Sequence, residues 1–161
     1  MDREQALAIT LGMRPGLIAF LAAIVLPLAA CGGDSGGTTA DWEGPPPPDA
    51  TGALAVDAFN AYLDGHPEFA AAPALAAARF VGLDRSTAAT TSIVVNAGGE
   101  GQGPVTATVT LDGLLDDSVR AQRFVLELSP EGDGWQVDSA AVAQRCHVGR
   151  GHQAFSPEPC I

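Results

Sequence analysis

The sequence contains no lysine, and all eight of its basic side chains are arginine, against 19 aspartates and glutamates. Since the formal net charge is −11 at pH 7, the chain repels phosphate backbones, and we expect no nucleic-acid partner. Long apolar runs are missing too. The longest apolar run begins near Leu17, ends at Ala30 and contains Pro27. It is shorter than the roughly 20 residues that a spanning helix needs. We therefore expect no transmembrane helix.

Motifs of the common enzyme classes are also absent. The sequence has no Gly-x-Ser-x-Gly elbow, no phosphate-binding glycine loop between a strand and a helix, and no Cys-x-x-Cys pair. Residues 33–37 match the surroundings of the serine-protease nucleophile, but no general base precedes them. We expect no cofactor, and an enzyme is less expected than a binding module.

The apolar run ends in Leu28-Ala29-Ala30-Cys31, which is an aliphatic residue, two small residues and a cysteine. This pattern resembles the lipobox of bacterial lipoprotein signal peptides. The resemblance implies that residues 1–30 are a signal peptide and that the Cys31 thiol receives a diacylglyceryl group. It also implies that a lipid anchor holds the mature chain on the extracytoplasmic face of the cell membrane. The lysine-free composition, rich in alanine, glycine and proline, favours a GC-rich genome of actinobacterial, Gram-positive type.

The first twelve residues do not fit a signal peptide, because they include Asp2 and Glu4. Residues 13–16, Met-Arg-Pro-Gly, instead place a short positive segment directly before the apolar run. We expect translation to start at Met13 rather than Met1.

Residues 31–50 follow the lipidation site with a glycine-rich stretch and then the run Pro45–Pro48. Glycine-rich chains are flexible and proline runs are stiff polyproline II spacers, so this segment is predicted to be a tether. Trp42 is expected to be a solvated residue of the tether, with a docking contact as the alternative.

Residues 51–161 are long enough for one domain with one core. Apolar periodicity predicts a helix from Leu54 to Asp64, with Asp57, Asn60 and Asp64 on a solvated stripe. A second helix is expected between Pro67 and Phe80, with an interruption at Pro73. Gly82 is expected to end it.

After Asp84 the pattern changes to the alternation of half-buried strands. Four strands are predicted near residues 91–96, 105–111, 124–128 and 135–142. Val105, Ala107, Val109 and Leu111 are expected to face the core in the second strand, and Phe124, Leu126 and Leu128 in the third. The fold class is therefore α+β, with two N-terminal helices packed on a four-stranded antiparallel meander.

This element order, with Trp135 and Val137 in the last strand, resembles the cystatin-like cone of nuclear transport factor two-like domains. The resemblance implies a pocket between helices and sheet that suits a small apolar ligand. The catalytic acid and tyrosine of the isomerases with this fold have no matching positions here, so no activity is implied.

Cys146 and Cys160 remain once Cys31 is lipidated. Outside the cytoplasm their pairing is expected, and a disulfide would staple the polar C-terminal tail. The alternative is a zinc site of Cys146, His147, His152 and Cys160, which the compartment and the adjacency of the first two residues disfavour.

Arg145, His147, Arg150 and His152 gather positive charge in an acidic chain. They are either a solvated or locally paired group, with Asp138 and Glu158 as candidate partners, or a site for an anionic wall polymer or partner protein. Two functions stay open. One is a ligand-binding or accessory module of the cell envelope, and the other is a small-molecule enzyme with its site in the cone.

Overall fold

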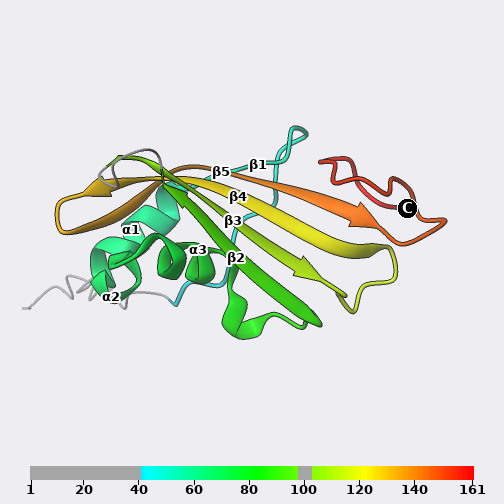
Figure 1. Cartoon of the computed structure of the whole chain (residues 1–161), viewed down its shortest axis with the longest axis horizontal. Coiled ribbons are helices and arrows are strands. Elements are labelled where there is room, and N and C mark those ends of the chain that lie inside the picture. The colour runs from blue at the N-terminus through cyan, green and yellow to red at the C-terminus, as the bar shows by residue number, and fades with distance from the viewer. Residues whose placement is uncertain (1–40, 98–102) are drawn as a thin grey trace, which may run out of the picture. The chain divides into compact units, whose positions relative to one another are not determined.

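The computed structural model describes residues 41–97 and 103–161, which form one α+β unit (Figure 1). The predicted signal peptide, the lipidation site Cys31 and the start at Met13 lie outside the described residues. None of the described helices is long and apolar enough to cross a membrane. The α+β class and the antiparallel meander are confirmed.

Five antiparallel strands form one sheet in the order β1-β5-β4-β3-β2. Their bounds are β1 Ala53–Leu54, β2 Thr90–Ala97, β3 Val105–Asp112, β4 Val119–Glu131 and β5 Gly134–Cys146. The helices are α1 Asp57–Gly65, α2 Pro67–Ala70 and α3 Pro73–Val81, followed by the 3-10 turn η1 Leu83–Arg85. The sequence predicted four strands and two helices, the second interrupted at Pro73, so strand β1 is the element that was not predicted.

Alternation along β3 and β4 produces the face of the sheet that carries the core. Val109 pairs with Phe124, which pairs with Val142, and paired residues point to the same side. We call this the inner face. The residues predicted to face the core in β3 and β4 are all buried, which confirms that expectation.

The helices lie together on the inner face (Figure 1). Pro73 begins α3 because proline lacks the N–H that the first helical turn leaves unbonded. Gly82 ends α3 in the left-handed conformation with φ 72°, as predicted. The predicted interruption at Pro73 is thus confirmed and divides the second helix in two.

The strand β1 occupies residues that were expected to begin the first helix. Leu54 pairs with Ala140 and Ala53 with Ala141, so α1 begins only at Asp57. Gly52 makes this approach possible, because a Cβ there would lie 2.5 Å from the Val142 carbonyl oxygen. Two residues are too few for alternation to reveal a strand.

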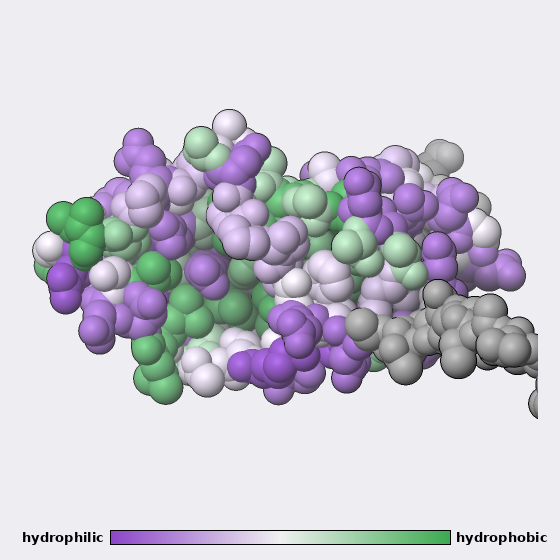
Figure 2. Space-filling model, turned by 180° about the vertical axis from the view of Figure 1, so that it is seen from behind, coloured by the Kyte–Doolittle hydropathy of each residue, from purple (hydrophilic) through white to green (hydrophobic). Residues whose placement is uncertain are grey.

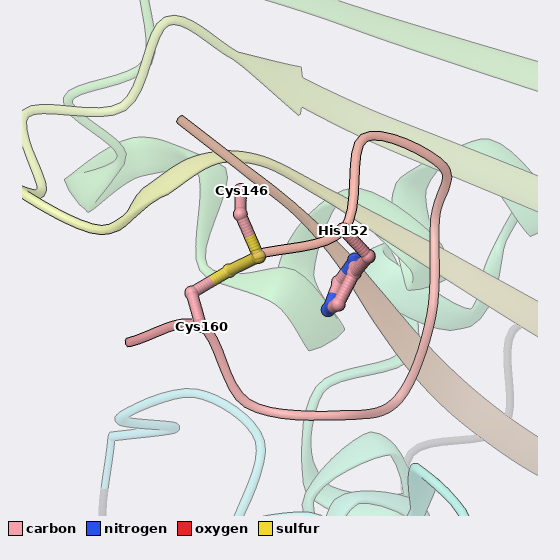
Figure 3. A group of neighbouring side chains, drawn as sticks. All are labelled: Cys146, His152 and Cys160. Atoms are coloured by element: carbon pink, nitrogen blue, oxygen red, sulfur yellow. A yellow bond between two sulfur atoms is a disulfide. The ribbon is translucent and has the colours of Figure 1, made fainter. Parts of the chain in front are cut away.

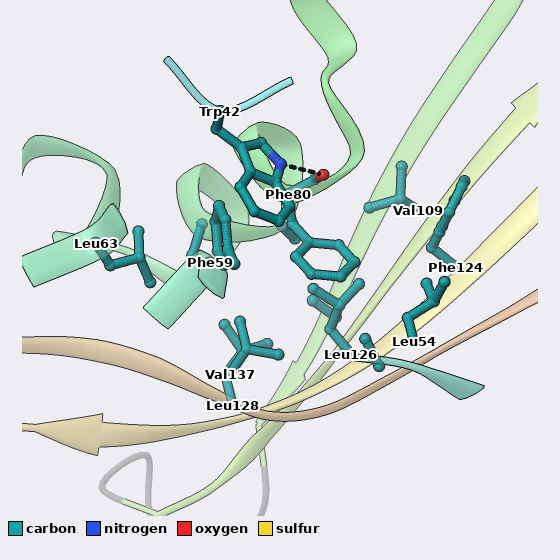
Figure 4. Close-up of a cluster of buried hydrophobic side chains, with 14 of the residues drawn as sticks. Trp42, Leu54, Phe59, Leu63, Phe80, Val109, Phe124, Leu126, Leu128 and Val137 are labelled. Carbon is teal, nitrogen blue, oxygen red and sulfur yellow. Dashed lines mark hydrogen bonds between the residues drawn. The ribbon is translucent and has the colours of Figure 1, made fainter. Parts of the chain in front are cut away.

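Large apolar side chains from the helices and the sheet fill the space between them (Figure 4). Phe59 and Phe80 from the helices and Leu126, Leu128 and Val137 from the sheet are almost completely buried. Trp42 joins this core with 9% of its surface exposed. The prediction that it is solvated is therefore wrong.

Asn60 also departs from prediction, because it does not face water alone. Its Nδ2 donates to the Val137 carbonyl at 2.9 Å, and its Oδ1 accepts from the Val137 N–H at 3.0 Å. The side chain thus caps a stretch of β5 that has no strand beside it there. Asp57 and Asp64 are exposed as expected.

Candidate functional site

An apolar cleft of about 460 Å³ opens on the helix-bearing side of the sheet. Figure 2 shows the domain from this side, where apolar side chains gather in a hollow. We call it the proline cleft, because the run Pro45–Pro48 forms one wall. Its other lining residues are Leu54, Val81, Leu111, Gln122, Phe124, Val142, Ala143, Gln144 and Pro157.

The proline wall is held where it enters the domain. The indole Nε1 of Trp42 donates to the Phe80 carbonyl at 2.8 Å (Figure 4), and Arg85 donates to the Trp42 carbonyl at 2.6 Å. One residue earlier, Asp41 forms an ion pair with Arg79 at 2.8 Å. These contacts fix both the main chain and the side chain just before the prolines.

Asp49 holds the other end of the proline wall. Its carboxylate accepts hydrogen bonds from the Thr51 hydroxyl at 2.7 Å and from the N–H groups of Thr51 and Ala53. These bonds, that from the Thr51 hydroxyl first, hold the pKa of Asp49 below its usual value. The turn leads directly into β1, so the prolines are fixed at both ends.

The facing wall includes part of the C-terminal tail. Ser156 exchanges two main-chain hydrogen bonds with Gln144 of β5, at 2.8 and 3.0 Å. This pairing places Pro157 beside Gly52, where it lines the cleft. Tail, β5 and β1 therefore meet at the cleft.

The cleft offers apolar surface and two amide side chains. The Gln144 amide donates to the Glu158 carbonyl at 2.9 Å, whereas the half-buried Gln122 amide makes no hydrogen bond within the described part of the chain. No lining residue is acidic, basic or a histidine. The arrangement can bind an uncharged apolar molecule and orient it through Gln122, but it offers no group for acid–base chemistry.

A second cleft of about 530 Å³ lies between α1 and the turn that joins β4 to β5. Asp57, Asp64, Glu131 and Asp133 line it together with half-buried Trp135. All four carboxylates are exposed to water. This is the ordinary state of acids on a solvated surface.

The predicted disulfide between Cys146 and Cys160 is present. His152 lies beside it, with its ring and the two sulfur atoms within 4.8 Å of one another (Figure 3). The sulfurs are bonded to each other and both ring nitrogens contact carbonyl oxygens. His147 is not part of this group, so the structure shows a disulfide rather than the alternative zinc site.

The basic residues of the tail differ in their surroundings. Arg145 donates to Asp112 Oδ2 at 2.7 Å, and Arg150 is exposed. Burial alone would raise the pKa of Asp112, but hydrogen bonds from Arg145 and the Gly113 N–H outweigh it and lower that pKa. Local pairing was one of the two alternatives for this group, but its acid is Asp112 rather than Asp138 or Glu158.

Phe155 covers the arginines on the outer face of the sheet. Its ring centre lies 3.9 Å from the Arg123 guanidinium carbon and 5.3 Å from that of Arg145. This cation–π stacking docks the tail on β4 and β5. This contact was not predicted from the sequence. The signal that could have revealed it is Phe155 itself, a single aromatic residue in a polar tail between two cysteines.

Comparison of the chain with protein-family models, curated proteins and solved structures found no match.

Proposed function

We propose that this protein is a lipoprotein anchored through Cys31, whose extracytoplasmic domain binds a small apolar ligand in the proline cleft. The observation that carries the proposal is the lining of the cleft, which combines apolar side chains with an unengaged Gln122 amide and lacks any titratable group. Its volume of about 460 Å³ falls within the usual range of small-molecule sites.

The architecture supports binding because the walls of the cleft are already in place. The prolines are restricted in φ and are held at both ends, by Trp42 and by Asp49. A wall that is ordered before the ligand arrives costs little entropy on binding. A cystatin-like cone with its pocket opened on one side remains the fold relationship that we propose.

The ligand class follows from the lining. A charged group would lose its hydration in this cleft without gaining a partner of opposite charge. An uncharged molecule with an apolar body and one hydrogen-bonding group for Gln122 fits best. The absence of a titratable lining group also favours a binder over the enzyme alternative.

Titration with the uncharged fluorescent probe N-phenyl-1-naphthylamine tests the proposal. We expect saturable binding of one probe per domain. Gln122→Trp fills the cleft and should weaken binding at least about tenfold, the effect of about 1.4 kcal/mol. Monoolein should displace the probe more effectively than oleate, because its head group is uncharged.

Val125→Trp is the matched control, because Val125 lies on the same strand but is exposed on the outer face. It should leave the affinity for the probe unchanged, and circular dichroism should show both variants folded. Equal binding by wild type and Gln122→Trp, or no saturable binding by wild type, would refute the proposed site.

A further inference from the structure

Residues 154–158 of the tail are held by the ring of His152. Its Nδ1 lies 2.8 Å from the Ala154 carbonyl oxygen and its Nε2 lies 2.8 Å from that of Glu158. A carbonyl oxygen only accepts hydrogen bonds, and a neutral imidazole has a single N–H. Both contacts are satisfied together only when the ring is the doubly protonated imidazolium.

The Glu158 carbonyl connects this ring to the proline cleft. It accepts from the Gln144 amide as well as from His152. Of the two residues before it, Pro157 lines the cleft and Ser156 pairs with Gln144 of β5, which also lines it. The histidine is therefore placed to hold or release this wall.

We propose that His152 is a pH-sensitive lock on the tail wall of the proline cleft, closed while its ring is protonated. This inference rests on the proposed function of the cleft for its biological meaning. Loss of the proton turns one of the two contacts into an approach of two lone pairs. The segment that carries Pro157 then loses one of its attachments and the ligand loses a fixed wall.

The surroundings of the ring raise the pKa of His152 on balance. The hydrogen bonds to the Glu158 and Ala154 carbonyls raise the pKa of His152, desolvation opposes them, and the Glu158 carboxylate adds to the rise. Other charged or titratable groups at this end of the domain include Arg145, which is paired with Asp112, and Asp116, which accepts hydrogen bonds from main-chain N–H groups. His147, Arg150, Asp117 and Arg120 lie in the same segments, and the Glu158 carboxylate is the charge that raises the pKa of His152.

The sign of the pH dependence follows from the raised pKa. The lock contributes fully below the ordinary histidine pKa of 6.5 and is lost as the pH rises through the higher pKa of the folded state. The wall is therefore firm while the ring is protonated and loosens as the pH rises through the raised pKa of His152.

Two measurements on the oxidised domain test the lock between pH 5.5 and 8.5. Exchange of the Ser156 amide, corrected for intrinsic rates, reports the tail directly. Fluorescence titration with N-phenyl-1-naphthylamine reports the cleft. For wild type we expect Ser156 protection and probe affinity each to fall by about fivefold as the pH rises, the effect of losing one ordinary hydrogen bond.

His152→Asn should show weak protection at every pH, whereas His147→Asn, in the same loop, should behave like wild type. Protection of Ser156 that is independent of pH in wild type, or a pH dependence that persists in His152→Asn, would overturn the lock. Exchange does not need the probe. A lock that is present in exchange but unaccompanied by probe binding would count against the proposed function alone.

Discussion

The indole of Trp42 lies among the rings of Phe59, Tyr62 and Phe80, with ring centres 4.9 to 6.3 Å away, although its neighbours in sequence are polar residues, glycine and proline. Its N–H is satisfied by a carbonyl 38 residues further along the chain. This single residue ties the segment before the prolines to the core. Without the indole, only the contacts of the Trp42 carbonyl with Arg85 and of Asp41 with Arg79 would hold the start of the proline wall.

Trp42→Ala tests this role at the residue scale. We expect a loss of about 3 to 5 kcal/mol in the free energy of unfolding, the usual effect of removing a buried aromatic ring, measured by urea denaturation. Trp135→Ala removes a half-buried indole and should cost clearly less. If Trp42→Ala lowers the free energy of unfolding by less than about 1 kcal/mol, Trp42 does not belong to the core.

At the scale of elements, β5 is the strand to which the other parts attach. It pairs with β4 along its length, with β1 on its other edge, and with Ser156 of the tail. Cys146 ends the strand as a fully buried residue bonded to Cys160. The disulfide therefore keeps the polar tail beside the cleft, where burial alone would not hold it.

In the double variant Cys146→Ala, Cys160→Ala the free energy of unfolding should be about 3 kcal/mol lower, because the disulfide reduces the conformational entropy of the unfolded chain by about that amount for a loop of this length. Urea denaturation of both proteins, with and without dithiothreitol, measures the difference. The reductant should destabilise wild type and leave the double variant unchanged. Labelling of unreduced wild type by a thiol reagent at these positions would contradict the disulfide.

On the scale of the whole molecule, the proposed anchor at Cys31 and the buried Trp42 lie close together in sequence. A lipid-anchored domain would therefore stay near the membrane surface, where uncharged apolar molecules are abundant. The strongly acidic chain is not attracted to anionic lipid. Under the proposed anchoring at Cys31, attachment to the membrane would depend on the acyl chains alone.

Labelling with radioactive palmitate in an actinobacterial host tests the anchor. Wild type should carry the label in the membrane fraction, and Cys31→Ser should carry none, because the thiol is the acceptor. Ser35→Ala, a nearby change that spares the lipobox, should label normally.

Precursor that accumulates under a lipoprotein signal peptidase inhibitor should begin at Met13, and a peptide starting at Met1 would refute that start.

Local rules determined much of this domain from sequence alone. The alternation in β3 and β4 predicted the buried face correctly, because strand side chains point to opposite sides in turn. Pro73 and Gly82 marked helix ends through restrictions that each residue carries within itself. The pairing of Cys146 with Cys160 was predicted because these are the two cysteines that remain when Cys31 is predicted to be lipidated.

The tertiary structure decided what depends on partners distant in sequence. Asn60 looked solvated on its own helix, yet it binds Val137, 77 residues away. The proline run looked like a spacer until Trp42 and Asp49 fixed it beside the sheet. His152 shows the same dependence at short range, because only the folded tail places the Ala154 and Glu158 carbonyls at its ring, and a side chain's chemistry is set by neighbours that folding supplies.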